Sequence, residues 1–590
     1  MSKKKFSFIF VISDEEVYEE SRCYLNRLRI PDGVEVEVHE LRAVKNLPLA
    51  LNHAMHRSDA KYKVYLQDYL FIVNPNFIEE VIKRFESSPE LGIMGMVGTN
   101  HPSLTGKVFE SYQLVGNIIE REAGTIQLKR FNGEFTKPIK LLDGKILITQ
   151  YDLPWREDIL TSSEYLGESQ SLEFTKSGFK AAVFNQNEDY FFYDPDFIEL
   201  QDLSEPVQGK FLSEYYSLLF PKVSVLIPTY NRPYYFEQAL QSVLTQTYKH
   251  VEIIVCDDST NDETQKLIDY YTQIYPNIVY KKNPKNLGQF NNDLQCMELS
   301  SGDFINFLMD DDLFHPQKIE KMMAYYMQDI NDEVNLITSH RHLIDAEGNI
   351  LHNRKVTKRA FEQDTLLNGI EFADYALKYN WNFIGEPTTV LFRKSALNSP
   401  FGTFCGREYG CNVDMATWLT LLSEGKAIYI SETLSYFREH SNQQLQSNLM
   451  KLMGATDYAH EILAAPSKGY LSQLEDLLYA MEFCFEYSSK TFDSLDEVYI
   501  NHPIYSELNQ YILQLKLKYS ETLIKQRQHY KEELERVEQL LSKFEENEKI
   551  SDEYGRLLML YEILSIKIDM YESDRNRGTQ SAINEESRKI

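Results

Sequence analysis

Apolar segments that end in carboxylates recur along the middle of this chain and constrain its fold most strongly. Residues 223–230 are an apolar run that stops at a proline and opens into a polar turn. Residues 251–258 are a second run that ends in two aspartates, and residues 304–308 are a third run that leads into a second acidic end. Helical apolar spacing separates the first two runs. The alternation predicts a parallel sheet with crossover helices, whose polar residues gather at the carboxyl ends of the strands.

The second acidic end is the triplet Asp310, Asp311 and Asp312. Adjacent carboxylates repel one another, and keeping them charged at a strand end is costly unless a cation lies among them. Mg²⁺ and Mn²⁺ prefer oxygen ligands and often bind one or two carboxylates together with substrate phosphates. Taken alone, the triplet indicates either a divalent-cation site or a solvated acidic turn.

In this order, the motifs resemble the family 2 glycosyltransferases of the GT-A fold over residues 221–445. The resemblance implies an α/β catalytic domain with a Rossmann-like, mostly parallel sheet, a UDP-sugar donor, and Mn²⁺ or Mg²⁺ as cofactor. It implies that the Pro-Thr-Tyr-Asn turn and the end of the second strand hold the nucleoside, and that an Asn-x-Gly loop closes over it. The implied nucleotide-binding residues are Pro228, Thr229, Tyr230, Asn231, Asp257, Asp258, Asn286, Gly288 and Asn292.

The acidic triplet resembles the DxD motif of that family. The resemblance assigns Asp310 to the ribose and Asp312 to the metal; Asp311 is open between these roles and is placed with the nucleotide contacts. A late Arg-x-His segment ends in His440. This histidine either approaches the metal or diphosphate, as the resemblance implies, or is structural, as a lone histidine usually is.

Inverting glycosyl transfer also needs a carboxylate that takes the proton of the attacking hydroxyl. The resemblance implies Asp414 for this role, although the usual Glu-Asp pair is Val-Asp here. The alternative is that Asp414 caps a helix, where aspartate is favoured anyway. Glu386, in a Gly-Glu-Pro-Thr-Thr segment, either lines the acceptor site or forms a buried ion pair with an arginine.

The first two hundred residues repeat the same plan in reduced form. Residues 6–13 parallel residues 223–230, and residues 34–40 parallel residues 251–257 at the same offset. A helix and a strand that follow in the second copy are missing from the first. The sequence therefore predicts a second, degenerate GT-A-like domain at the N-terminus.

The first copy has lost most of the triplet. The alignment places Gln67 and Tyr69 against the outer two carboxylates and keeps Asp68. Because an amide and a phenol cannot replace that charge, metal-dependent transfer is not expected there. Later motifs resemble glycosyltransferase-like domains, with Glu168 where Asp is expected and Tyr193 where a late His often falls. This domain either binds an acceptor or scaffolds the second domain, or it performs a metal-independent transfer.

The last third of the chain predicts helices. A 4-3 spacing indicates either an antiparallel pair within the chain or a contact between two copies, and so a homo-oligomer; its positions are Leu523, Tyr530, Leu534, Val537, Leu541 and Phe544. Residues 557–564 predict a helix that packs on the protein or touches a membrane surface as a peripheral contact. The expected domains are 1–205 (degenerate GT-A-like), 206–222 (linker), 223–450 (catalytic), 451–572 (helical) and 573–590 (disordered tail).

Composition excludes several classes. The net charge of −28 argues against nucleic-acid binding, and no apolar run approaches the roughly eighteen residues of a membrane span. Six scattered cysteines favour a reducing, cytoplasmic location. The expectation is a metal-dependent, inverting hexosyltransferase or N-acetylhexosaminyltransferase that moves a sugar from a UDP-sugar to a hydroxyl of a growing surface glycan or glycoprotein. The alternatives are a non-catalytic sugar-nucleotide-binding scaffold and a bifunctional enzyme with two transferase domains.

Overall fold

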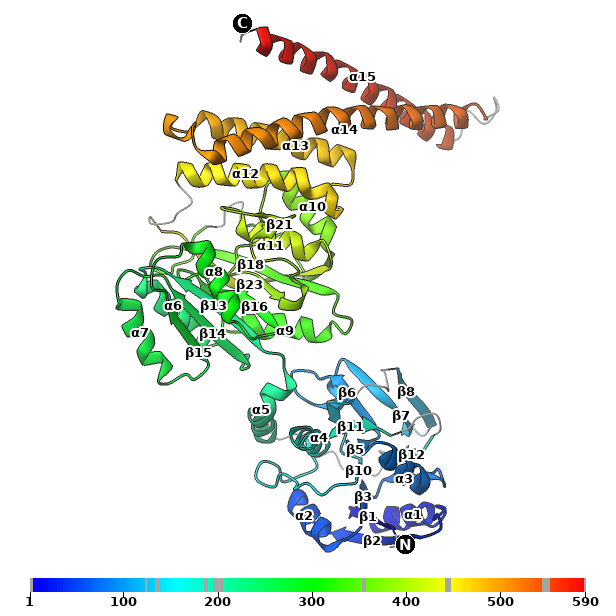
Figure 1. Cartoon of the computed structure of the whole chain (residues 1–590). Coiled ribbons are helices and arrows are strands. Elements are labelled where there is room, and N and C mark those ends of the chain that lie inside the picture. The colour runs from blue at the N-terminus through cyan, green and yellow to red at the C-terminus, as the bar shows by residue number, and fades with distance from the viewer. Residues whose placement is uncertain are drawn as a thin grey trace. The chain divides into compact units, whose positions relative to one another are not determined.

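The computed structural model describes residues 4–122, 125–132, 138–184, 189–194, 205–352, 357–440, 447–543 and 552–587. This part of the chain divides into two compact units (Figure 1). The first holds residues 1–222, with the short stretches 247–251 and 319–333 grouped with it; the second holds the rest of the chain from residue 223 on.

The first unit combines two sheets with helices. Its elements are β1 (Lys4–Ile12), α1 (Glu15–Leu25), β2 (Val34–Arg42), α2 (Leu47–Arg57), β3 (Tyr62–Gln67), β4 (Leu70–Ile72), α3 (Phe77–Ser87), β5 (Leu91–Gly95), β6 (Val97–His101), β7 (Gln113–Glu122), β8 (Thr125–Asn132), β9 (Leu141–Leu142), β10 (Ile146–Thr149), α4 (Leu166–Lys176), β11 (Lys180–Val183), β12 (Phe191–Tyr193) and α5 (Glu205–Leu219). The main sheet has the order β11-β5-β10-β3-β1-β2, and the smaller sheet has the order β4-β12-β7-β6-β9, with β8 paired to β7.

The second unit carries a larger mixed sheet. The elements from residue 223 on are β13 (Val223–Thr229), α6 (Pro233–Leu244), β14 (Val251–Asp257), α7 (Glu263–Thr272), β15 (Ile278–Lys282), α8 (Gln289–Leu299), β16 (Phe304–Phe307), β17 (Leu313–Phe314), α9 (Lys318–Gln328), β18 (Val334–Ile344), β19 (Thr365–Asn368), α10 (Gly369–Tyr379), β20 (Leu391–Arg393), β21 (Thr403–Phe404), β22 (Arg407–Glu408), α11 (Val413–Leu422), β23 (Lys426–Arg438), α12 (Asn448–Ala464), α13 (Leu474–Asp493), α14 (Pro503–Leu541) and α15 (Asp552–Ser587). The sheet has the order β15-β14-β13-β16-β20-β18-β23-β17, with β19 paired to β23.

The two main sheets share one topology. Strand β10 is antiparallel to β3 and β5, as β20 is antiparallel to β16 and β18. Strand β11 is parallel to β5, as β23 is parallel to β18. Within the described ranges the first sheet ends at β2, whereas the second continues through β14 to β15. The predicted α/β class is confirmed, and so is the reduced copy at the N-terminus.

Strand register corrects the alignment of the two copies. Val64 of β3 and Asn306 of β16 pair with residues of β1 and β13 that the repeat aligns with each other. Four residues beyond each of them stand Asp68 and Asp310. Asp68 is therefore the counterpart of Asp310, and the sequence alignment that set Gln67 there was wrong by one residue. In the first copy, Tyr69 and Leu70 occupy the positions of the other two carboxylates.

The C-terminal helices belong to the core of the second unit. Helices α12, α13 and α14 pack on one another (Figure 1). Leu452 of α12, Cys484 of α13 and Leu515 of α14 are fully buried in the same cluster as Leu226 of β13 and Trp418 of α11. The helical region is thus continuous with the catalytic domain that the sequence predicts, because their apolar side chains form a shared core.

Other segments depart from the expected boundaries. Most of the expected linker, 206–222, is helix α5, and helix α15 runs to Ser587, through residues expected to be a disordered tail. Four of the predicted heptad positions of α14 pack against Leu557, Tyr561, Leu564 and Ile568 of α15 in the same chain, as the intrachain alternative predicts: Tyr530, Leu534, Val537 and Leu541. Leu523 instead packs against the main core of the unit, and Phe544 lies outside the described residues. No helix within the described ranges is both long and apolar enough to cross a membrane.

Two leucines on α14 test the shared core. Leu515 is fully buried and Leu517 is 63% exposed on the same helix. We expect Leu515→Ala to lower the free energy of unfolding of the second unit by about 2–5 kcal/mol, because it leaves a cavity. Leu517→Ala, the matched control, should change it by less than about 0.5 kcal/mol. Denaturant titration followed by tryptophan fluorescence measures both; equal effects would contradict a core that includes α14.

Candidate active site in the second unit

The predicted site residues of the second unit gather where its central strands end. Strand β13 ends at Thr229 and β14 at Asp257, and the acidic triplet follows β16. All seven residues of β13, Pro228 included, are buried. Helix α6 starts directly after the polar turn, with Pro233 in its first turn, where a missing N–H is no loss.

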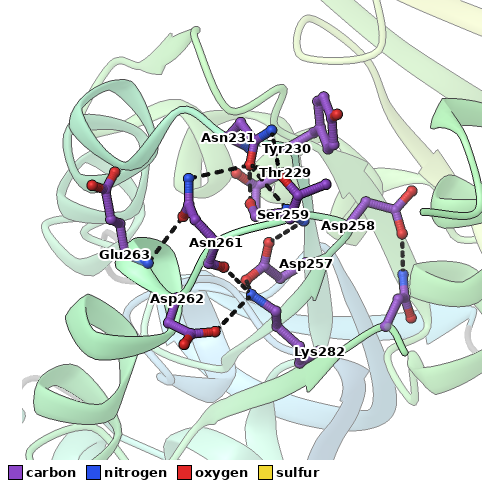
Figure 2. Close-up of polar contacts among 12 residues, drawn as sticks. Thr229, Tyr230, Asn231, Asp257, Asp258, Ser259, Asn261, Asp262, Glu263 and Lys282 are labelled. Carbon is purple, nitrogen blue, oxygen red and sulfur yellow. Dashed lines mark hydrogen bonds and ion pairs between the residues drawn. The ribbon is translucent and has the colours of Figure 1, made fainter. Parts of the chain in front are cut away.

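Asp257 anchors one end of this edge (Figure 2). Its side chain is fully buried and accepts hydrogen bonds from the Ser259 amide at 2.8 Å, the Tyr280 hydroxyl at 2.9 Å and the Lys282 ammonium at 3.3 Å. The Lys282 ammonium also donates to the carbonyl oxygen of Asn261. The carboxylate therefore ties the end of β14 to β15 and to the loop between β14 and α7.

Asp258 connects the strand end to the loop before α8. Its carboxylate accepts from Asn283 Nδ2 at 2.6 Å and from the Leu287 amide at 3.0 Å. Asn283 Nδ2 also donates to Asn292 Oδ1 at 2.8 Å. The loop ends at Gly288, which has a φ of +80° that residues other than glycine rarely adopt. The Gly288 amide donates to Asn286 Oδ1 at 2.7 Å.

The turn after β13 is held from both sides (Figure 2). Asn231 has a φ of +53°, a left-handed conformation that asparagine tolerates better than most residues. Its amide donates to Ser259 Oγ at 2.8 Å, and its Oδ1 accepts from the Thr260 amide at 3.0 Å. Tyr230, beside it, is 41% exposed. The turn is thus fixed while an aromatic ring stays open to a ligand.

Asp310 joins the triplet to this turn. It accepts from Thr229 Oγ1 at 2.9 Å, from the Tyr230 amide at 3.2 Å and from Arg232 Nη1 at 3.1 Å. The same guanidinium donates to Asp311 Oδ2 at 3.0 Å. Arg232 therefore supplies positive charge to two of the three carboxylates.

The other two carboxylates face the end of β23. His440 Nε2 lies 2.9 Å from Asp311 Oδ2. Asp312 accepts from Thr388 Oγ1 at 2.6 Å and from the Arg438 amide at 3.0 Å. The structure thus brings His440 to the triplet.

Burial makes it costly for the carboxyl groups of the triplet to be charged. Desolvation, with the neighbouring Asp311 charge, raises the pKa of Asp310 to about 6 and raises the pKa of Asp312 well above its usual value. No His, Cys, Asp or Glu cluster in the described ranges is arranged to hold a metal with three or more ligands. The donors nevertheless fit a hard cation that takes one or two carboxylates and completes its shell with substrate phosphate.

Asp414 lies in the first turn of α11 and is not its N-cap, which is Asn412. Its carboxylate accepts from Asn382 Nδ2 at 2.7 Å and from the Met415 amide at 2.8 Å. Burial, with a smaller contribution from the Glu386 charge, raises the pKa of Asp414 to about 6. The N-cap alternative for Asp414 is therefore wrong, and its half-buried carboxyl is held by these two donors.

Glu386 forms an ion pair with an arginine, the second of the two alternatives that the sequence left open. Its Oε2 lies 2.5 Å from Arg341 Nε, and its Oε1 accepts from Arg341 Nη2 at 3.1 Å. The Glu386 charge raises the pKa of Asp312 as well as that of Asp414. The paired carboxylate of Glu386 is therefore near both the triplet and Asp414.

Sequence reasoning missed the residue that positions α11. Asp457 of α12 is fully buried and accepts from the amides of residues 410, 411 and 412 at 3.1, 2.7 and 3.0 Å. Arg407 Nη1 donates to the same carboxylate at 2.6 Å. Helix α12 thus fixes the segment that leads into Asp414. Nothing in the linear sequence marks this contact, since Asp457 lies within an ordinary amphipathic helix.

Arg232 and Asn283 were also missed, although the signal was present. Arg232 directly follows the polar turn, and Asn283 opens the loop that ends at Gly288. Both side chains stand next to residues that the resemblance names. Polar residues adjoining a motif at a strand end were the available clue.

Two family models match this chain. Residues 7–215 match a model described as "Glycosyltransferase like family", and residues 224–399 match "Glycosyl transferase family 2". The matched segments fall in the first and second units respectively. The chain therefore carries two successive domains of the glycosyltransferase family 2 type.

Curated relatives carry related names. A GalNAc(5)-diNAcBac-PP-undecaprenol beta-1,3-glucosyltransferase from Campylobacter jejuni is 29% identical, over 37% of this chain and 65% of its own length. An uncharacterized glycosyltransferase from Methanocaldococcus jannaschii is 33% identical, over 24% of this chain and 49% of its own. A Bacillus subtilis glycosyltransferase named for teichuronic acid biosynthesis is 27% identical, over 41% and 87%. The chain thus spans less than two thirds of two of these relatives.

Among solved structures, S. aureus TarS 1-349 in complex with UDP-GlcNAc aligns with 51% of this chain and 92% of its own, at 16% sequence identity. The TM-score is 0.34, which is too low to support an argument about this chain.

Removing Asp457 tests the anchoring of α11. We expect Asp457→Ala to destabilise the second unit by about 3 kcal/mol, because Arg407 and several backbone amides lose a buried partner. Asp493→Ala, at an exposed position on α13, is the matched control and should have little effect. Thermal and denaturant unfolding measure the difference; an Asp457→Ala variant as stable as the control would rule out the anchor.

Proposed function

We propose that the second unit is a metal-dependent, inverting glycosyltransferase that takes a sugar from a UDP-sugar and places it on a hydroxyl of a surface glycan. The observation that carries the proposal is the pairing of two acidic groups in different settings. The triplet lies beside the turn at Tyr230, whereas Asp414 is half-buried and accepts from the Asn382 amide group and a backbone N–H. The triplet suits the binding of a diphosphate with its counter-ion, and Asp414 suits the role of proton acceptor.

The residues divide the reaction between them. The turn at Tyr230 and the edge at Asp257 and Asp258 hold the nucleoside. Asn382 holds the carboxylate of Asp414 in one orientation, so that its free lone pairs accept the proton of the acceptor hydroxyl as the hydroxyl attacks the anomeric carbon. With a pKa of about 6, Asp414 is ionised at neutral pH yet basic enough for this transfer.

A divalent cation, held by Asp312 with His440 or Asp311 at its side, would supply positive charge for the departing diphosphate. Arg232 adds a fixed positive charge on the same side, since its guanidinium already pairs with Asp310 and Asp311. Three carboxylates outnumber the two guanidiniums at this end of the edge, those of Arg232 and of Arg438, whose Nε donates to the Asp311 carbonyl oxygen at 2.6 Å. That imbalance supports the metal assignment.

The names of the relatives support a surface-glycan acceptor. One relative is named for an undecaprenol-linked glycan and another for teichuronic acid biosynthesis. Both acceptors present sugar hydroxyls. A growing carbohydrate is therefore a better acceptor for the proposed enzyme than a protein side chain.

Replacing Asp312 tests the metal assignment. We expect Asp312→Ala to abolish Mn²⁺-stimulated release of nucleoside diphosphate from the best donor in a panel of UDP-, GDP- and dTDP-sugars. Asp269→Ala, which removes an exposed carboxylate on α7, is the control for a change of charge alone. If the Asp312→Ala protein keeps most of the stimulated rate at wild-type stability, Asp312 does not bind the cation.

The pH profile tests Asp414. A base must be ionised, and its pKa is about 6, so kcat/KM should fall about tenfold per pH unit below pH 6 and level off above it. Asp414→Asn should lose about 10²–10⁴-fold in kcat. Asp414→Glu, which keeps a carboxyl group, should retain the acidic limb at an altered pH. An unchanged profile in Asp414→Asn would assign that limb to another group.

A further inference from the structure

The first unit has a charged cluster where the second unit has its site. Asp68 and Tyr69 follow β3, Asp143 and Lys145 precede β10, and Glu168 lies in the first turn of α4. Asp68, Asp143 and Glu168 are all buried. Nothing in the function proposed for the second unit uses these residues.

Strand register aligns this cluster with the second site. Ile148 of β10 pairs with Val64, and Leu391 of β20 pairs with Asn306, at equivalent points of the two sheets. Counting back five residues from Ile148 and from Leu391 sets Asp143 against Glu386; counting back three sets Lys145 against Thr388. Glu168 and Asp414 each stand in the first turn of the helix that follows.

The residues at the ends of β13 and β14 also have counterparts in the first unit. Asp68 accepts from the amides of Ser13 and Asp14 at 2.6 and 2.8 Å, as Asp310 accepts from the turn after β13. At the end of β2, Glu40 accepts from the Tyr18 hydroxyl at 2.5 Å and pairs with Arg42. This set of carboxylate, phenol and cation repeats the set around Asp257 with different residues.

The two sites differ in how positive charge is provided. Tyr69 and Leu70 replace two carboxylates of the triplet, so the donors no longer fit a divalent cation. In the place of Thr388, which touches Asp312, the first unit puts the ammonium group of Lys145. It lies 3.8 Å from Asp143 Oδ2, 3.9 Å from the centroid of the Phe109 ring and 5.0 Å from that of Tyr193. The backbone around Lys145 is fixed, because Asp143 accepts from the amides of Val97 and Lys145.

We propose that the first unit is a second glycosyl-transfer site that works without metal, with Lys145 as the positive group for the donor's diphosphate and Glu168 as the base. The bond from the anomeric carbon to the diphosphate oxygen breaks, and the electron pair leaves with the diphosphate beside the Lys145 ammonium. The acceptor oxygen forms the new bond to the anomeric carbon, and its proton passes to the carboxylate of Glu168. The reaction class is the one proposed for the second unit, but the activity of that unit is not required.

Burial supports Glu168 in this role. Desolvation raises the pKa of Glu168 to about 7, with a further contribution from the Asp143 charge, as burial and Glu386 do for Asp414. Its Oε1 accepts from the Val108 amide at 3.2 Å, which orients the carboxyl group. The two copies therefore keep the same pair of acids, with Asp and Glu exchanged.

The test uses the full chain with the second site disabled by Asp312→Ala and Asp414→Asn together. Nucleoside diphosphate released from UDP-, GDP- and dTDP-sugars is measured in excess EDTA. We expect an EDTA-resistant rate that falls about 10²-fold on Lys145→Met or Glu168→Gln and is largely kept by Lys145→Arg. Lys180→Met, which removes a surface ammonium paired with Glu90, is the matched control and should keep the rate.

Absence of EDTA-resistant release with every donor would overturn the inference, as would a rate that Lys145→Met leaves unchanged. Melting curves and the Lys145→Arg variant separate loss of the charge from loss of the fold. The Mn²⁺-stimulated rate of the single variant Lys145→Met reports on the second unit alone. A normal stimulated rate there, without an EDTA-resistant one in the disabled chain, would remove the second site and leave the proposed function intact.

Discussion

Crowding of buried carboxylates at the strand ends is the constraint on which the second unit depends. Asp257, Asp310 and Asp312 lie out of water and Asp414 is half-buried, surroundings in which an unpaired charge is costly. Each is held by groups from elsewhere in the unit: Lys282 on β15, Arg232 after β13, Arg438 on β23 and Asn382 after α10. The sheet order brings these groups together. Because each acid needs such partners, the chemistry and the topology of the unit constrain each other.

The two copies answer the same electrostatic problem differently. The second keeps an excess of negative charge that favours an exchangeable cation, and the first exchanges two of the acids for Tyr69 and Leu70 and carries its own ammonium at Lys145. The framework that positions the acids is unchanged, since β3, β10 and β5 pair as β16, β20 and β18 do. The two copies therefore share the positions of their charged groups more closely than the sign of the charge at each position.

The leading strands of each copy and the polar edge were predictable from the sequence because they rest on local apolar runs and on motifs next to them, whereas the order of the strands in each sheet came from the structure. The missing helix and strand of the first copy were visible as a gap in the repeat. Contacts made by distant segments were not predictable. Asp457 and Lys145 act through side chains whose neighbours lie far away in sequence, and a one-residue error at Gln67 could be seen only once strand pairing fixed the register.

The core shared by the sheet and α12–α14 also sets the order in which the chain can fold as it leaves the ribosome. The first unit's cluster, from Ile9 to Val183, is complete before β13 emerges. The shared core of the second unit is not complete until Leu508 and Leu515 have been synthesised, long after β23. A nascent chain that ends near residue 450 therefore lacks the helices that cover the apolar side chains of α10, and exposed apolar surface of this kind is what chaperones bind. Folding of the second unit is in this sense completed after translation of its catalytic residues.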